Sequence, residues 1–525
     1  MASWKSPMVP IICLDNLDFE ESVHEKSVEK TTQMFHGTWG YLHVPNKELI
    51  DQFDPEEFSL ERYQKAILDL ADMQVQPSWF LPSNDSSLHF QDVIKSQITK
   101  VLLEYIATPL DKNQNLNTFP PPIDPIAVKK PNFLMFKLMV ALDNSSKGVG
   151  EVLEGFLRQT KISSEQFFSR LQVLEGNLAT CMNLESLRAQ QKPSSHIQDN
   201  LSGFFSLLGA SHVLWNFRPG RIPSEQLTTK KYFTLMLTHM TKCHEATIIY
   251  CILTVMNLPK ALLPEEKAKL PSQRLKETVD LCYNQFFSPV ALRSASVDLA
   301  TGLKNNLLWL RDFAAIIECD RAMRAGDIGR VLNMWKCFTV MAHGIKGLNN
   351  YAIYLPRMIL LLTKVLPKGL AKTLLHSLLI NPSGRPNHFV AKDFFLENNN
   401  FWLKYFYNHS GIGTEISRLK DIFLVIIPIL RKLVQGIKGN SGKNVLSWNG
   451  PTTQFTLQII YVQLKDCVDI YKAGLAALHK DYQQKKKKLN RMQPLTILLY
   501  HTPTVPIEEA NMFEEEEEDI GDLKE

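Results

Sequence analysis

The longest uniform pattern in this chain is helical, and it extends from Thr228 to Leu379. Apolar residues recur there at intervals of three and four, and the alternating β-branched stretches that are typical of strands are missing. Proline and glycine punctuate the pattern at Pro259, Pro264, Pro271, Gly326, Pro356 and Pro367. We therefore predict an all-helical region here, so that any sheet has to be built from segments outside it.

Strand-like segments lie on the N-terminal side of this region. Val9–Phe19 is an apolar run that ends in acids, and Thr32–Val44 is rich in aromatic and β-branched residues. We expect these two segments to pair antiparallel across the polar segment between them. Two further strand candidates follow, Asn132–Leu142 and Phe167–Leu174.

These patterns indicate an α/β chain with a dominant helical part. A proline-rich linker, Thr108–Pro131, separates the first strand candidates from the later ones. The expected division is 1–48 for the first strands of a core, 49–131 for a helical and proline-rich accessory segment, 132–220 for the rest of the core sheet, 221–385 for a helical insertion, 386–495 for core and C-terminal helices, and 496–525 for a disordered acidic tail.

One polar face interrupts an otherwise aromatic helix in the segment DFFLENNNFWLK. Asp393, Glu397, Asn400 and Lys404 are spaced by four, three and four residues, which places them on one side of a helix. The spacing by itself favours an internal ladder in which Lys404 pairs with the acids. The alternative is that this helix delivers an acid to a site built by other segments, because buried acids need partners.

Further polar residues follow the strand candidates. Asp15 ends the first strand, and Asn177 lies just after the fourth, where Thr180 would cap the next helix, Cys181–Gln190. Carboxylates from separate elements, with Glu397 as the last, are what two Mg²⁺ or Mn²⁺ ions about 4 Å apart require for phosphoryl transfer. The alternatives are an ordinary turn aspartate and an ordinary turn asparagine.

His212 lies four residues before Asn216 in the apolar segment Phe204–Phe217. This setting favours a core histidine whose hydrogen bonds are satisfied over a functional one.

Six sequence blocks resemble domain-of-unknown-function family 6589, which is associated with eukaryotic mobile-element-like proteins. The resemblance covers roughly residues 10–435, and the last block is the most specific. The blocks are LDNLDF at 14–19, EGNLAT at 175–180, GASHVLWN at 209–216, AGDIGR at 325–330, NNYAIYLPRM at 349–358 and NPSGRPNHFVAKDFFLENNNFWLK at 381–404. Their order is similar to that of RNase-H-like transposase cores of the Asp-Asp-Glu type with a helical insertion before the last acid.

This resemblance implies an RNase-H-like core sheet that carries the helical insertion and a helical C-terminal region. It makes Asp15 the first acid and Glu397 the last, both as catalytic and metal-binding residues, with Asp393 and Asp327 as rival acids. The second acid falls on Asn177, and an amide brings no charge to a divalent cation. The resemblance therefore implies a transposase or nuclease core, dependent on Mg²⁺ or Mn²⁺ if active, that Asn177 impairs.

Charge is distributed unevenly along the chain. The segment 514–525 holds eight acids and one lysine, so the net charge of +4 for the whole chain leaves +11 on the other residues. A basic body with an acidic tail is compatible with contact to a nucleic acid such as DNA, or with a tail that competes for that contact. The favoured alternative is a tail that is only solvated and disordered.

A cluster of basic residues near the C-terminus is a candidate for contact with nucleic-acid phosphates or for a nuclear-import signal. A solvated helix end is an equally good interpretation, because cations are favourable at the C-terminus of a helix. The cluster consists of Lys485, Lys486, Lys487, Lys488 and Arg491.

The remaining features point to an intracellular protein. The eight cysteines are scattered without a CxxC pair, which suits a reducing compartment. The best apolar runs, Ala246–Met256 and Phe423–Leu430, are too short to span a bilayer.

Two rival functions remain open, a non-enzymatic helical scaffold and a nucleic-acid-binding protein. Convergence of Asp15, Asn177 and Glu397 in space would favour the enzyme ancestry over the scaffold.

Overall fold

A computed structural model gives the fold of this chain, which divides into two compact units, Met1–Leu464 and Lys465–Glu525. All described residues belong to the first unit. They are 6–21, 31–111, 116–191, 194, 196, 201–217, 233–259, 264, 266–297, 301–345 and 347–409.

Several predictions concern residues beyond this described part. They are the helices expected after residue 409, the acidic tail, and the basic cluster of Lys485, Lys486, Lys487, Lys488 and Arg491. These expectations stay predictions, because all of these residues lie outside the described residues.

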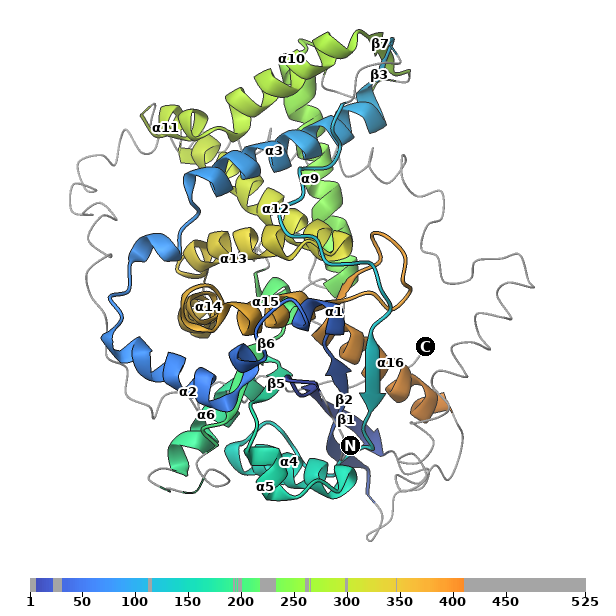
Figure 1. Cartoon of the computed structure of the whole chain (residues 1–525). Helices are drawn as coiled ribbons and strands as arrows, with labels where there is room; N and C mark the ends of the chain where they lie inside the picture. The colour runs from blue at the N-terminus through green and yellow to red at the C-terminus, as the bar shows by residue number, and fades with distance from the viewer. Residues whose placement is uncertain are drawn as a thin grey trace, which may run out of the picture. The chain divides into compact units, whose positions relative to one another are not determined.

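A mixed five-stranded sheet forms the centre of the first unit, in the order β4-β2-β1-β5-β6 (Figure 1). Neighbouring strands are antiparallel from β4 through β2 to β1 and parallel from β1 through β5 to β6. The expected α/β class and the antiparallel pairing of the first two strands are confirmed. The strands are β1 (Ile11–Glu21), β2 (Gln33–Val44), β4 (Asn132–Met135), β5 (Gln172–Gly176) and β6 (Phe204–Leu208).

The later strand predictions need correction. The third strand, β4, is much shorter than the predicted 132–142, and the fourth, β5, begins only at Gln172. The residues before β5 form the short helix α5 (Ser164–Phe168), because the Ser163 side chain accepts a hydrogen bond from the Gln166 amide and caps it. The apolar residues 204–208, to which we assigned no element, form β6 at the edge of the sheet.

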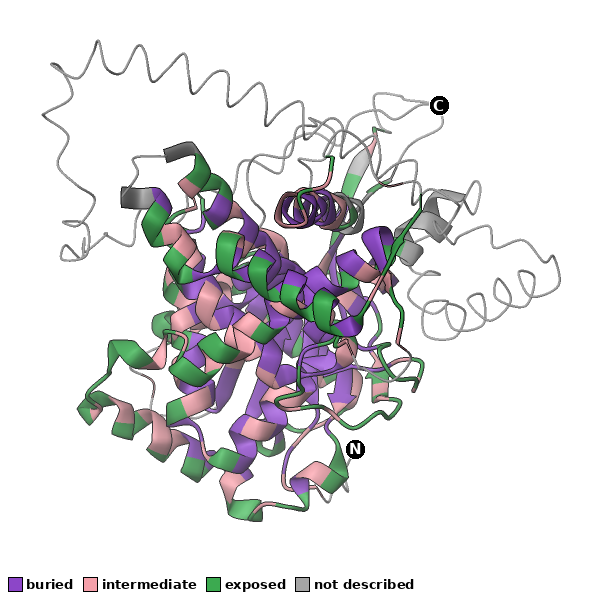
Figure 2. Cartoon of the chain, turned by 90° about the horizontal axis from the view of Figure 1, so that it is seen from above, coloured by how far each residue is buried: buried purple, intermediate pink, exposed green. Residues whose placement is uncertain are grey.

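Helices cover both faces of the sheet. On one face, Ile12, Leu14 and Leu174 pack with residues of α4 (Ser146–Thr160), α5 and α6 (Leu178–Gln190). On the other face, Cys13 and Val173 belong to a larger core that includes residues of α2 (Leu60–Asp69), α8 (Ala210–Asn216), α13 (Ile328–Ala342), α14 (Asn349–Leu360), α15 (Lys368–Ser377) and α16 (Lys392–His409). Figure 2 shows the buried residues gathered between these layers. The alternation of β1 side chains between two cores follows from the two-residue period of a strand.

A second group of helices has a hydrophobic core of its own, which includes Ile98, Ile252, Leu275 and Leu310. These helices lie at the top of Figure 1, and they are α3 (Asn84–Val101), α9 (Phe233–Val255), α10 (Ser272–Cys282), α11 (Pro289–Val297) and α12 (Thr301–Ala325). The predicted helical region is therefore largely helical. Most of its helices pack either in this second core or in the larger core against the sheet.

Short strands correct the prediction that this region is all-helical. β7 (Ala268–Leu270) pairs in parallel with β3 (Ala107–Pro109), and the Leu110 amide extends the ladder to the Leu270 carbonyl. Pro271 ends β7, and the three-residue strand is too short to show a periodicity in the sequence. The hairpin of β8 (Leu379–Ile380) and β9 (Val390–Ala391) leads directly into α16.

The remaining short helices are α1 (Lys47–Ile50), the 3-10 turns Pro55–Phe58, Leu70–Asp72 and Pro77–Trp79, and the π-helical turns Leu102–Ile106, Tyr283–Phe287 and Leu361–Val365.

The junction between α12 and α13 fixes the rival acid Asp327. Its carboxylate accepts hydrogen bonds from the amides of Ile123 and Asp124, at 2.8 and 3.0 Å, and from the Arg330 amide at 3.1 Å, which caps α13. The Arg330 Nε donates to Glu318 Oε1 at 2.7 Å, and both side chains are buried. These contacts give Asp327 a structural role, since it joins the proline-rich segment to the helical region.

We predict that Glu318→Gln lowers the free energy of unfolding by about 3 kcal/mol, because it leaves the buried Arg330 charge unpaired. The double substitution Glu318→Met with Arg330→Met should recover most of this loss. Asp320→Asn is the control, since its pair with Arg324 is more exposed and should contribute less than about 1 kcal/mol. Urea unfolding of the four proteins measures these differences, and equal losses for Glu318→Gln and Asp320→Asn would contradict the prediction.

Candidate metal centre

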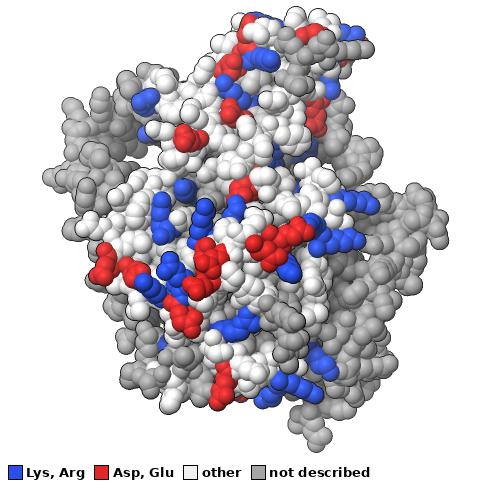
Figure 3. Space-filling model, viewed as in Figure 1, with Lys and Arg blue, Asp and Glu red and all other residues white. Residues whose placement is uncertain are grey.

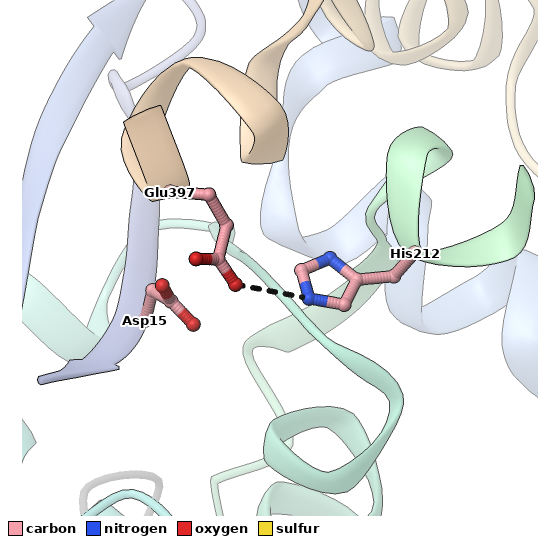
Figure 4. A group of neighbouring side chains, drawn as sticks. All are labelled: Asp15, His212 and Glu397. Atoms are coloured by element: carbon pink, nitrogen blue, oxygen red, sulfur yellow. Dashed lines mark ion pairs between the residues drawn. The ribbon is translucent and has the colours of Figure 1, made fainter. Parts of the chain in front are cut away.

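Three side chains from distant parts of the chain converge at the sheet. Asp15 comes from β1, His212 from α8 and Glu397 from α16, and one ligand atom from each lies within 4.8 Å of the others. Figure 4 shows the three side chains pointing toward one another from these three elements. The expected meeting of Asp15 and Glu397 is therefore present in the structure.

The position of Asp15 follows from the pleat of β1. Asp15 lies two residues from both Cys13 and Leu17, so it shares their face of the strand. Cys13 and Leu17 belong to the core on the α16 side of the sheet. Its Oδ2 accepts a hydrogen bond of 2.6 Å from Asn400 Nδ2, one turn beyond Glu397 on α16. Its Oδ1 is buried, and no described residue offers it a hydrogen bond. Burial, followed by the nearby charge of Glu397, raises the pKa of Asp15 well above its usual value.

Asp393 holds the imidazole of His212 in a fixed orientation. Its Oδ2 lies 2.8 Å from His212 Nδ1, and the amides of Ser211 and His212 donate to the same carboxylate at 3.1 and 2.9 Å. A Cβ at position 209 would lie 2.4 Å from Asp393 Oδ2, so only glycine permits this close approach. His212 Nε2 is left facing Glu397 Oε1 at 3.6 Å. In metal sites, a histidine ligand is commonly oriented by a carboxylate that forms a hydrogen bond with its other ring nitrogen.

The charges at this site hold a proton on the imidazole. Burial alone lowers the pKa of His212, but the hydrogen bond with Asp393 and the close contact with Glu397 outweigh it and raise the pKa to about 10. For Asp393, burial raises the pKa, and the contact with His212 outweighs this and lowers it below its usual value. The site therefore contains one imidazolium among three acids, Asp15, Asp393 and Glu397.

The first turn of α16 is anchored to the sheet by buried polar contacts. Lys392 Nζ lies 2.6 Å from Glu175 Oε2 of β5, and both side chains are almost completely buried. Tyr41 of β2 donates its hydroxyl to the Lys392 carbonyl at 2.8 Å. The polar face of this helix thus contacts other segments through Asp393, Glu397 and Asn400, as the second of the two alternatives above expects. The side chain of Lys404 lies outside the described residues.

Asn177 has a different role from its expected one. Its Oδ1 accepts a hydrogen bond from the Thr180 amide at 2.8 Å and lies 3.1 Å from the Thr180 hydroxyl, so Asn177 caps α6, where Thr180 was expected to be the cap. It follows β5, the parallel neighbour of β1, at the register that Asp15 has on β1. It does not belong to the converging group of three residues.

From the sequence, His212 is interpreted as a core histidine with satisfied hydrogen bonds and is not placed with Asp15 and Glu397. It lies in a largely buried segment, as expected, but its ring contacts acids 181 and 185 residues later in the chain. Spacing within residues 204–217 contains no signal of those partners.

A divalent cation fits the three donors after a small movement. Metal–ligand distances of about 2.0–2.2 Å allow two ligand atoms of one ion to be about 4.4 Å apart at most, which is only slightly less than the 4.8 Å within which these three atoms lie. The Glu397 side chain is 35% exposed and has room to move, whereas Asp15 and His212 are held by Asn400 and Asp393. The unsatisfied Asp15 Oδ1 is the atom that such an ion would satisfy.

Comparison with known proteins identifies one family. The sequence model of a family of unknown function, DUF6589, matches residues 70–222 and 219–447, more than half of the chain. The match includes His212, Asp393 and Glu397 and begins after Asp15. No curated protein and no solved structure matches the chain. Among the described helices, none is both long and apolar enough to cross a membrane.

The raised pKa of His212 predicts how stability depends on pH without metal. A group whose folded-state pKa is raised stabilises the fold fully below its unfolded pKa, about 6.5, and this contribution is lost as pH rises toward about 10. We compare the free energy of unfolding of the wild type with that of His212→Gln, both in EDTA. Between pH about 6.5 and about 10, the wild-type value should fall relative to that of the variant by up to about 1.4 kcal/mol for each pH unit. Urea unfolding at pH 6, 7, 8 and 9 measures it, and parallel pH profiles would contradict it.

Proposed function

Since the chain belongs to the family of unknown function DUF6589, its activity has to be inferred from the site, and we propose that Asp15, His212 and Glu397 bind a divalent cation. The core is that of a protein derived from a mobile element, related to Asp-Asp-Glu polynucleotidyl transferases and impaired in their chemistry. The observation that carries this proposal is the convergence of the three ligand atoms within 4.8 Å, from residues 15, 212 and 397.

The charge of the site favours a cation. Asp15, Asp393 and Glu397 surround one imidazolium, and Asp15 and Asp393 are nearly inaccessible to water. Buried carboxylates are costly unless a positive charge balances them. A divalent ion at His212 Nε2 would displace the proton and supply that charge, with Asp393 stabilising the ligand from behind.

The donor set favours Mn²⁺ over Mg²⁺. Mg²⁺ prefers oxygen ligands in near-ideal octahedral geometry, whereas two carboxylates with an imidazole suit Mn²⁺ and other transition metals. Such an ion binds and polarises a phosphate oxygen in the chemistry of this class. DNA is the substrate class that the mobile-element origin suggests.

The sheet supports the proposed ancestry. Three antiparallel strands followed by two parallel ones, with the first acid on the central β1, are compatible with the RNase-H-like core that the sequence blocks imply. The helical insertion expected at 221–385 then separates the core strands from α16, which brings the last acid. Asp327 caps α13 and Asp393 orients His212, so neither rival replaces Glu397 in this proposal.

Impairment follows from Asn177. A two-metal mechanism needs carboxylates on both sides of the shared first acid, and Asn177 contributes a neutral amide that is already engaged by Thr180. We therefore expect little nuclease or strand-transfer activity from the wild-type protein.

The two rival functions have weaker support. A scaffold needs no convergence of buried acids around a histidine. For nucleic-acid binding, the face drawn in Figure 3 shows lysines and arginines interspersed with acids over the described residues, without one continuous basic surface on that face. The proposed contacts with DNA and the nuclear-import signal stay with the basic cluster outside the described residues, which is Lys485, Lys486, Lys487, Lys488 and Arg491.

We predict that the full-length protein binds Mn²⁺ in calorimetric titration, and that His212→Gln and Glu397→Gln each weaken this affinity at least tenfold. Loss of an outer-shell partner alone typically costs 10–100-fold, and loss of a direct ligand should cost no less. Because His212 must release a proton, the wild-type affinity should rise about tenfold per unit between pH 7 and 9. Asp312→Asn, a partly buried acid on α12, is the control and should leave the affinity unchanged. Unchanged affinity in both ligand variants would refute the proposed site.

Asn177→Asp tests whether the site is a damaged metal centre. Aspartate caps a helix as well as asparagine does, so the fold should be retained. The added charge should raise Mn²⁺ affinity at least tenfold, and adding Asp15→Asn to the repaired protein should abolish the gain. Calorimetry of the three proteins measures these effects. If Asn177→Asp folds and leaves affinity unchanged, Asn177 is only a helix cap.

A further inference from the structure

A buried carboxylate that the sequence interpretation did not select lies beside the position of the missing second acid. Asp143 stands in the segment between β4 and α4, and it is 2% exposed. Its Oδ2 accepts a hydrogen bond of 2.7 Å from the Thr180 hydroxyl. The same hydroxyl lies 3.1 Å from Asn177 Oδ1. The carboxylate oxygen of Asp143 and the amide oxygen of Asn177 are therefore less than about 6 Å apart.

Helix α6 holds Asp143 in this place by a second contact. Asn183 Nδ2 donates to the Asp143 carbonyl at 3.0 Å, one turn after Thr180. Since α6 begins directly after β5, it fixes Asp143 at the C-terminal end of that strand. β5 is the parallel neighbour of β1, so this is the side of Asp15 where a second acid would have to lie.

The charge of Asp143 is not balanced by a described basic side chain. Within the described part of the chain, the ion pairs involve no Asp143 contact, and its side-chain partner is the neutral Thr180. Asp15 contributes the second observation, since its Oδ1 is buried and unsatisfied among the described residues.

We propose that Asp143 holds a second divalent cation together with Asp15, which is then shared with the cation at His212 and Glu397. The neutral amide of Asn177 still leaves this second position one carboxylate short of a complete two-metal site. Thr180 orients the carboxylate of Asp143, and Asn177 remains a helix cap. This inference rests on the proposed metal site and adds a second cation position to it. The chemical class of ligand is a hard divalent cation, because Asp15 and Asp143 offer only oxygen donors.

Calorimetric titration of Mn²⁺ into the full-length protein, with electron paramagnetic resonance of the loaded protein, tests this inference. The wild type should bind two ions per chain. Two ions about 4 Å apart are magnetically coupled, so the six-line signal of isolated Mn²⁺ should be lost. Asp143→Asn keeps the side-chain volume and an acceptor for Thr180, and it should reduce the stoichiometry to one ion and restore the six-line signal. Asp312→Asn, as the matched control, should behave as the wild type.

A second variant covers the case that Asp143→Asn does not fold. Thr180→Val removes the hydroxyl that holds Asp143 but keeps the Thr180 amide that Asn177 caps, so the second ion should bind at least tenfold more weakly and the first unchanged. One ion per chain in the wild type, unaffected by Asp143→Asn or Thr180→Val, overturns the second position and leaves the single-cation site intact. No binding by the wild type overturns both.

Discussion

The docking of the first turn of α16 on the sheet is the contact on which the candidate site depends. Lys392 forms a fully buried ion pair with Glu175 of β5, and its carbonyl accepts the hydroxyl of Tyr41 from β2. The next residue, Asp393, accepts two amides of α8 and binds His212. Breaking a buried pair by removing one partner leaves an uncompensated charge, so these contacts hold the helix in one register. That register decides where Glu397 and Asn400 lie.

Acidic and basic side chains alternate at the site, from Glu175 in the sheet outward to Glu397. Glu175 faces Lys392, Asp393 faces His212, and His212 faces Glu397. Alternating charges at short range stabilise one another in a low-dielectric interior far more than they would at the surface. Asp15 and Asp143 add two buried acids beyond this alternation. His212, whose ligand atom lies within 4.8 Å of that of Asp15, already faces Asp393 and Glu397, and no ion pair among the described residues includes Asp143. This excess of buried acids over basic side chains is the physical basis for the proposed cations.

The helical region separates two parts of the site that have to meet. α8 and α16 contact each other, and the chain between them builds most of the helical core and part of the core against the sheet. Asp327 and the Glu318–Arg330 pair fix α13 against the segments before it, so the helical region is joined to the sheet unit by specific polar contacts as well as apolar ones. The helical region therefore returns the chain to the sheet at a defined place, where the β8–β9 hairpin leads into α16.

The sequence by itself determined the α/β class, the antiparallel first pair of strands, the mainly helical region and the single polar face of α16. Each of these depends on the periodicity of apolar and polar residues within one segment, and this periodicity can be seen directly in the sequence. The tertiary structure alone decided that His212 belongs with Asp15 and Glu397, that Asn177 caps α6, and that Asp143 lies beside it. It also decided the short strands β3 and β7, whose pairing is made across the chain. These contacts join segments far apart in sequence, and the free energy that selects them comes from burying charges beside partners that no local pattern reveals.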